Sequence, residues 1–215
     1  MTLPVAKTLI AALACAALLL PLLLQAWQVA AIVMAYLTLN IAYTLSLKHE
    51  VLVDVFCIVA GFMLRIICGT YAVGITPSRW LLLCSFMLTL FLGFTKRRAE
   101  FVTTPNIAAQ PVGSTRLVLR MYSPQLLDIL VAVTASTTLL TYGLYTVDAD
   151  TVAQQGTQNL VFTLPIVTFG IFRYLYLLYA QGSGEDPGKD LLGDPQIRIA
   201  VAAWVVLVLC LIGGV

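Results

Sequence analysis

Long apolar stretches alternate along this sequence with short polar segments. A helix that crosses a bilayer needs about 20 mostly apolar residues, and seven stretches come near that length. The stretches that we predict as spanning helices are Val5–Leu24, Trp27–Leu47, Val51–Val73, Trp80–Thr95, Leu126–Val147, Leu160–Tyr179 and Ile197–Val215. The pattern therefore predicts an all-α, multi-pass transmembrane helical bundle.

Helix-starting and helix-breaking residues refine these boundaries. Ser123-Pro124 is typical of an N-cap followed by a first-turn proline, and it predicts the start of the fifth span. Pro165 lies inside the sixth stretch and predicts a kink there. Pro105 and Pro111 interrupt any helix in the long polar segment between the fourth and fifth spans. No repeat or linker divides the chain, so we predict one domain over residues 1–215.

The composition supports the membrane interpretation. Hydrophobic residues make up 60% of the chain and charged residues only 10%, and the mean hydropathy is +0.97. Soluble domains carry about 25% charged residues, so a soluble or disordered protein is excluded. The net charge of +2 gives no reason to expect a nucleic-acid partner. The five cysteines lie in apolar stretches, and we interpret them as packing residues.

The basic residues are distributed unevenly between the connecting segments. One set of alternate connections and span ends holds Lys7, Lys48, Lys96, Arg97, Arg98, Arg116, Arg120, Lys189 and Arg198. The other set holds only Arg79. By the positive-inside rule, the first set and the N-terminus are cytoplasmic and the C-terminus is outside.

Four ionisable residues fall within the predicted spans and need a partner or a water-filled cavity: Asp54, Arg65, Asp128 and Arg173. Asp54 and Arg65 share a helical stripe with glycines, but eleven residues separate them, about 16 Å along a helix. They therefore cannot pair directly. Each of the four residues is either a functional group or half of a structural ion pair.

Arg173 shares a stripe with Phe169 and Tyr176. A cavity that binds an anion or an aromatic edge would explain that stripe, and so would an ion pair inside the bundle.

The tract Lys96–Glu100, with sequence Lys-Arg-Arg-Ala-Glu, ends the fourth predicted span, and Lys48 ends the second on the same side. Arginine forks match phosphate oxygens and lysine supplies a point charge. A convergent set of these residues suits a phosphorylated substrate, whereas a topological anchor is the alternative.

The last polar connection holds Asp186, Asp190 and Asp194. Prolines and glycines interrupt this segment, so we predict a solvated loop rather than a helix that binds Mg²⁺. His49, the single histidine, has no acid or metal ligand at a useful spacing and is interpreted as incidental.

Four elements in a fixed order carry a resemblance to a known family. The stretch Asn40–Asp54 resembles the Y-[ST]-x-x-L-K…D element of UbiA-type membrane prenyltransferases. The stretches Leu92–Glu100, Tyr122–Asp128 and Phe172–Tyr176 are similar to one branch of that superfamily, the decaprenyl-phosphate phosphoribosyltransferases. The resemblance runs from about Ala31 to the C-terminus.

The resemblance implies a UbiA-like bundle, with about seven spans of a nine-helix fold, in a bacterial plasma membrane. It implies transfer of 5-phosphoribosyl from phosphoribosyl diphosphate to a polyprenyl phosphate at the cytoplasmic face, in cell-wall arabinan precursor synthesis, with Mg²⁺ as cofactor. The substrate-binding residues that we expect on this basis are Tyr43, Lys48, Asp54, Arg65, Lys96, Arg97, Arg98, Glu100, Tyr122 and Arg173. No residue is assigned as catalytic or as a metal ligand.

One family motif has no counterpart in this sequence. Family members carry N-D-x-x-D-x-x-x-D between their second and third helices, and no such run occurs here. We therefore expect a C-terminal portion of the fold, which a split or truncated gene, a mis-set start codon or a fragment would each produce. An isolated chain of this kind is expected to be inactive unless a companion chain or another copy supplies the aspartates. The alternatives are a UbiA-type prenyltransferase with an aromatic acceptor, and a catalytically inactive membrane interaction protein. The cationic Lys96–Glu100 tract favours a phosphate-bearing acceptor over an aromatic one, because the aspartate-rich loop of the general prenyltransferases would lie there.

Overall fold

The computed structural model describes residues 3–23, 25–75, 77–103, 117–180, 182 and 187–213. All regular secondary structure in these ranges is helical, which confirms the predicted all-α class. The chain forms two compact units, Met1–Pro77 and Ser78–Val215, called here the N-terminal and the C-terminal unit. The prediction of a single domain stays a prediction.

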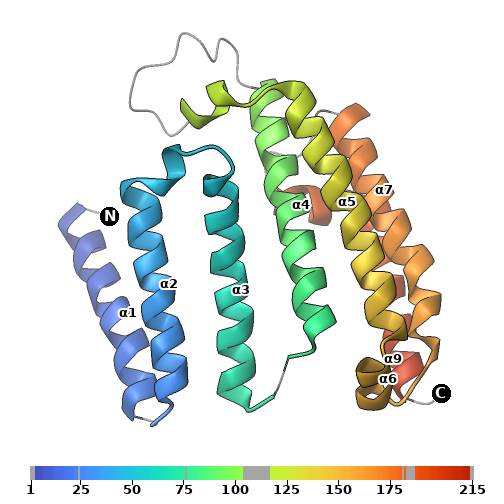
Figure 1. Cartoon of the computed structure of the whole chain (residues 1–215), viewed down its shortest axis with the longest axis horizontal. Coiled ribbons are helices and arrows are strands. Elements are labelled where there is room, and N and C mark those ends of the chain that lie inside the picture. The colour runs from blue at the N-terminus through green and yellow to red at the C-terminus, as the bar shows by residue number, and fades with distance from the viewer. Residues whose placement is uncertain are drawn as a thin grey trace. The chain divides into compact units, whose positions relative to one another are not determined.

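The N-terminal unit is a row of three antiparallel helices (Figure 1). They are α1 (Leu3–Leu23), α2 (Trp27–Leu45) and α3 (Val53–Val73), with the 3₁₀ turn η1 (Leu47–His49) between the last two. Helix α2 packs against both α1 and α3. Helix α3 ends at Gly74, whose φ of 73° suits a residue without a side chain and whose N–H bonds carbonyls of the last turn.

The C-terminal unit contains four long helices and several short ones (Figure 1). In chain order these are α4 (Arg79–Thr103), η3 (Leu117–Met121), α5 (Pro124–Val147), α6 (Ala149–Gln155), η4 (Asn159–Thr163), α7 (Leu164–Ala180), α8 (Pro187–Gly193) and α9 (Pro195–Gly213). Helix α5 packs against α4 and α7, and α7 packs against α9.

Threonines make up half of the buried residues of α5, at Thr134, Thr138, Thr141 and Thr146, and Ala135 is another small one. The Thr134 hydroxyl donates to the Leu130 carbonyl at 2.7 Å, and Thr138 and Thr141 make the same bond one turn back at 2.7 and 2.8 Å. Small side chains let two helices approach closely in a membrane, and hydroxyls bonded within their own helix cost little there. The residue pattern thus explains the close packing of α4 on α5.

Among the described residues, six helical segments are long and apolar enough to cross a membrane. They correspond to the second through seventh predicted spans, so the multi-pass membrane architecture holds. The first predicted span also forms a helix, α1, but it is not one of these six, and its passage through the membrane stays a prediction.

Two local predictions were wrong in the region around α7 and α8. Pro165 does not kink a continuous helix, because the 3₁₀ turn η4 ends at Thr163 and α7 begins at Leu164. Pro165 thus lies in the first turn of α7, where the missing N–H costs nothing. The segment after α7 is not all loop either, since α8 forms over Pro187–Gly193 with its proline at the first helical position.

A series of hydrogen bonds links α9, α5 and η4 in the C-terminal unit. Trp204 Nε1 on α9 donates to Tyr142 Oη on α5 at 2.7 Å. The Tyr142 and Thr163 hydroxyls lie 2.6 Å apart, and Thr163 donates to the Leu160 carbonyl. These bonds satisfy polar groups that would otherwise be costly at membrane depth.

Candidate functional site

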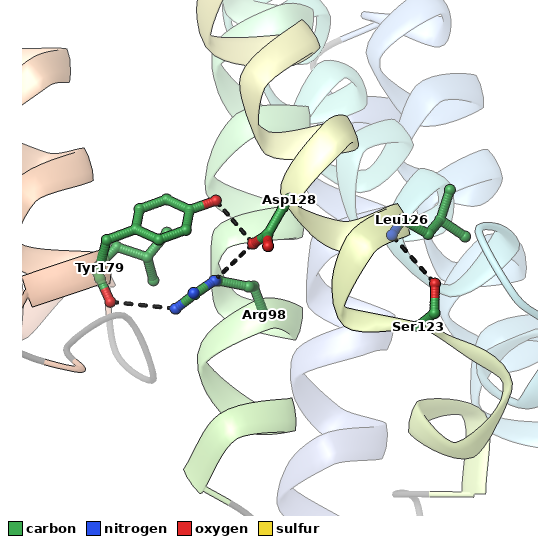
Figure 2. A network of polar contacts seen from close by, with 6 residues as sticks. Arg98, Ser123, Leu126, Asp128 and Tyr179 are labelled. Atoms are coloured by element: carbon green, nitrogen blue, oxygen red, sulfur yellow. Dashed lines mark hydrogen bonds and ion pairs between the residues drawn. The ribbon is translucent and has the colours of Figure 1, made fainter.

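Arg98, near the end of α4, lies at the centre of a polar cluster in the C-terminal unit (Figure 2). Its Nε donates to Asp128 Oδ1 at 3.0 Å, and a terminal nitrogen donates to the Leu178 carbonyl at 3.3 Å. The guanidinium carbon lies 3.9 Å from the centre of the Tyr179 ring, and the Tyr179 hydroxyl donates to Asp128 Oδ1 at 2.9 Å. These four residues, which we call the Arg98 cluster, tie α4, α5 and α7 together.

The local sequence of α5 explains how Asp128 reaches this cluster. Ser123 caps α5, since its hydroxyl accepts the N–H of Leu126 at 3.2 Å (Figure 2), and Pro124 is the first helical residue. This confirms the predicted helix start. Asp128 follows about one turn later on α5. Its negative charge near the helix N-terminus is also favoured by the helix dipole.

The basic tract lies inside α4 and not at its end, because the helix continues to Thr103. Helical spacing gives its residues different surroundings. Arg97 pairs with Glu100, three residues later, at 2.6 Å, while Arg98 is held by the cluster. Lys96 is exposed to solvent. Lys96 is therefore the cation of the tract that the described structure leaves most accessible to a ligand.

Arg173 on α7 forms a bidentate ion pair with Asp194, at 2.7 and 3.2 Å, and lies over the Tyr176 ring at 5.0 Å. Asp194 also accepts the N–H of Ile197 at 2.9 Å and so caps α9. The prediction that places Asp194 in a solvated loop was wrong for this residue. Its role is that of a helix cap and ion-pair partner, which proline and glycine neighbours do not prevent.

The same contacts act on the acidity of Asp194. The hydrogen bond from the Arg173 guanidinium holds the pKa of Asp194 below its ordinary value, and the Ile197 N–H acts in the same direction against the opposing effect of burial. The ionised carboxylate is therefore the form that this site stabilises.

In the N-terminal unit, the predicted residues Tyr43, Lys48 and Asp54 occupy the turn between α2 and α3 and its flanks. Lys48 lies in η1 and is half-buried. Asp54 is fully buried in the first turn of α3, where the helix dipole favours a carboxylate. These residues keep their positions at one end of the α2–α3 pair, close to an aqueous interface.

Arg65 lies farther along α3, at membrane depth. Its guanidinium donates to the hydroxyl of Tyr36 on α2 and lies 5.0 Å from the Tyr36 ring centre and 5.2 Å from that of Phe62. A cavity of about 160 Å³ is lined by Arg65 together with Tyr43. Thus the structure brings two of the predicted site residues to one cavity.

The remaining predicted residues have simpler outcomes. Tyr122 is buried between η3 and α5. Arg116, Pro105, Pro111 and Asp186 lie outside the described residues, as do the side chains of Lys7 and Asp190.

No Mg²⁺ site is formed by the described residues, since they contain no group of three or more His, Cys, Asp or Glu side chains placed to hold a metal ion. Glu100, Asp128 and Asp194 instead pair with arginines. The carboxylates described for this chain therefore do not fit the metal that the family resemblance implies.

Sequence reasoning missed Tyr179, which contributes a ring and a hydroxyl to the Arg98 cluster. It identified Asp128 as a residue that needs a partner but did not find that partner. The two arginine–carboxylate pairs join residues 30 and 21 positions apart, and no local spacing rule connects such residues.

The fold and site define a multi-pass helical membrane protein with a cationic tract inside α4. A scan against protein-family models finds no match. Curated proteins do match: the chain is 27% identical over 176 residues to the decaprenyl-phosphate phosphoribosyltransferase of Corynebacterium glutamicum. It is 30% identical over 183 residues to that of Mycolicibacterium smegmatis and 28% identical over 181 residues to that of Mycobacterium tuberculosis.

These matches confirm the resemblance that the motifs predicted: the chain is similar to decaprenyl-phosphate phosphoribosyltransferases, which are of the UbiA type. They cover 82%, 81% and 84% of this chain and 52%, 56% and 57% of the three relatives. The chain thus spans about half the length of the curated relatives it matches.

Proposed function

We propose that this protein takes part in transferring 5-phosphoribosyl from phosphoribosyl diphosphate to a polyprenyl phosphate. The names of the relatives supply the reaction class. The observation in this chain that carries the proposal is the basic tract of α4, in which an exposed Lys96 lies beside the paired Arg97 and the anchored Arg98. Both substrates bear phosphates, and clustered cations are what two anionic groups need in order to approach each other.

The reaction has little need of a general base. An oxygen of the lipid phosphate forms a bond to the anomeric carbon of the ribose. The bond from that carbon to the diphosphate oxygen breaks, and diphosphate leaves with the electron pair. Catalysis then consists mainly of placing the two anions and stabilising the charge that develops on the leaving group.

We assign different roles to the cations of the tract. Lys96 binds a substrate phosphate, because its ammonium is accessible. Arg97 binds the same phosphate, and contacts to the phosphate oxygens replace its ion pair with Glu100. Arg98 positions the helix end, because the Arg98 cluster already uses its guanidinium for two hydrogen bonds and a ring contact.

Tyr43, Lys48 and Asp54 form a second group of proposed pocket residues, in the N-terminal unit. Tyr122 is a further proposed substrate-binding residue, in the C-terminal unit. In this proposal the basic tract and Lys48 face the cytoplasm of a bacterial cell, where phosphoribosyl diphosphate would be available. Mg²⁺ remains the expected cofactor of the reaction, although the described carboxylates do not fit it. A companion polypeptide or another copy would have to supply the metal ligands.

The test is transfer of labelled phosphoribosyl to polyprenyl phosphate in membranes that contain this chain with Mg²⁺. One arm uses the chain alone, and the other adds a co-expressed segment that carries the N-D-x-x-D-x-x-x-D motif. We expect product in at least one arm and a tenfold or greater loss for Lys96→Ala.

Arg79→Ala is the matched control, since Arg79 is a basic residue at the opposite end of the same helix. It should retain the parent rate. Product in neither arm overturns the proposal, and so does an equal loss for both variants. Transfer of a prenyl group to an aromatic acceptor in the same membranes would favour the general prenyltransferase activity.

A further inference from the structure

Arg65 differs from the three ion-paired arginines described above, because none of its described contacts is to a carboxylate. Arg97 pairs with Glu100, Arg98 with Asp128 and Arg173 with Asp194. In the described part of the chain, the contacts of Arg65 are the neutral Tyr36 hydroxyl and two aromatic rings. Ring contacts attract a cation but leave its charge uncompensated.

The position of Tyr36 fixes the depth of this charge. Tyr36 is the middle residue of α2, nine residues from either end, which corresponds to about 13 Å of helix on each side. The hydrocarbon core of a bilayer extends about 15 Å on each side of its midplane. Because the guanidinium is bonded to Tyr36, Arg65 is held near the midplane instead of extending to the aqueous surface, and a charge at that depth requires a partner.

In the described ranges, no carboxylate of the spanning helices matches that depth. The N-terminal unit has only two acidic residues, Glu50 and Asp54. Asp54 lies in the first turn of α3, about 16 Å along the helix from Arg65, and Glu50 comes three residues before α3 begins. In the C-terminal unit, the acidic residues within the described spanning helices are Glu100 and Asp128, each within the last or first five residues of its helix. Neither this unit nor a second copy therefore offers a carboxylate at the midplane.

The surface around Arg65 is hollow on both sides. The cavity of about 160 Å³ extends toward Tyr43 and Gly61, and another of about 330 Å³ extends toward Ile32 and Gly69. Both are lined by Tyr36 and Arg65, and we call the two cavities together the α2–α3 groove. A Cβ atom added at Gly69 would meet nothing within 4 Å. Grooves with small residues are where transmembrane helices approach each other closely.

We propose that the α2–α3 groove binds a transmembrane helix from outside this chain that carries an aspartate or glutamate at the bilayer midplane, where it pairs with Arg65. The charge and the depth select this partner. Lipid headgroups and water-soluble phosphates keep their charges at the membrane surface, about 15 Å away. The groove shares Tyr43 with the proposed substrate pocket, and the inference goes beyond the proposed transferase activity.

The test measures association of the full chain with synthetic leucine–alanine transmembrane peptides by energy transfer in phosphatidylcholine bilayers. The peptides are identical except for a central aspartate, asparagine, leucine or arginine. We expect the aspartate peptide to associate at least tenfold more tightly than the leucine peptide. This preference should disappear in Arg65→Leu, persist in Arg65→Lys, and reverse in favour of a central-arginine peptide in Arg65→Asp.

A matched peptide with its aspartate two turns from the centre tests the depth and should lose the preference. Gly69→Leu fills the groove while keeping the charge, and it should weaken association of every peptide. Equal association of the aspartate and leucine peptides overturns the inference. Loss of the preference on adding phosphatidylglycerol or inorganic diphosphate also overturns it, because the site would then bind a lipid headgroup or a soluble anion.

Discussion

Replacing Asp128 with alanine tests whether the Arg98 cluster holds the C-terminal unit together. The change removes the acceptor for both Arg98 Nε and the Tyr179 hydroxyl. It leaves the Arg98 guanidinium with the Leu178 carbonyl and the face of the Tyr179 ring. The result is a partly buried cation without its counter-ion, which destabilises a folded protein more than the loss of a contact between exposed groups.

The expected size follows from the exposure of the two side chains. Breaking a fully buried pair costs about 3 to 5 kcal/mol, while an exposed pair contributes about 0 to 1 kcal/mol. Arg98 is 17% exposed and Asp128 44%, so an intermediate loss of about 2 kcal/mol is expected from the ion pair. The hydrogen bond of the Tyr179 hydroxyl to the carboxylate adds about 0.5 to 1 kcal/mol. Together these values correspond to a drop of about 5 to 10 °C in melting temperature.

The assay is thermal unfolding in detergent micelles for the parent, Asp128→Ala, Arg98→Ala and the double variant. A coupling energy of about 1 to 2 kcal/mol between Arg98 and Asp128 is expected from this cycle. The control is Ile129→Ala, because Ile129 is the next residue on α5 and its side chain is 60% exposed. Additive effects of the two cluster variants, or an Asp128→Ala melting temperature within 1 °C of that of Ile129→Ala, would refute the reasoning.

Other variants test single contacts by the same thermal assay. Asp194→Asn should destabilise the protein at neutral pH, because Arg173 stabilises the ionised carboxylate and lowers the pKa of Asp194. The difference in melting temperature between parent and variant should shrink as the pH falls below the ordinary aspartate pKa of 3.8, since the parent then loses its ionised carboxylate. A difference independent of pH would contradict this. Tyr142→Phe should cost about 1 to 2 kcal/mol by leaving Trp204 Nε1 without its acceptor, and an unchanged melting temperature would argue against the bond. Leu52→Gly should raise stability by about 1 kcal/mol, because Leu52 adopts a φ of 67° that a branched side chain disfavours; a decrease would contradict the strain.

The sequence was sufficient to predict the membrane fold because span length and apolar content are local properties. The Ser123-Pro124 start of α5 was likewise local and was confirmed. The kink predicted at Pro165 was wrong, because local pattern did not reveal how this stretch divides into helices. A proline inside an apolar stretch predicts a kink, but the stretch itself divides into η4 and α7, and that division depends on packing at the helix start.

The candidate site was predicted less completely, since its contacts join residues distant in the sequence. The basic tract could be identified from composition, but which cation would be accessible could not. Which cation is accessible depends on the contacts of Asp128 and Tyr179 that hold Arg98 in place. Asp194 was assigned to a loop because its neighbours break helices, whereas its own role is set by Arg173, 21 positions earlier.

Helix α9 is the last helix of the C-terminal unit in chain order, and polar groups of two earlier helices bond to it or to its cap. Asp194 and the first turn of α9 complete the Arg173 ion pair, and Trp204 donates to Tyr142 on α5. Until α9 has entered the membrane, Arg173 and Tyr142 expose polar groups to lipid. Insertion of α9 is thus the step that conceals these polar groups of α5 and α7.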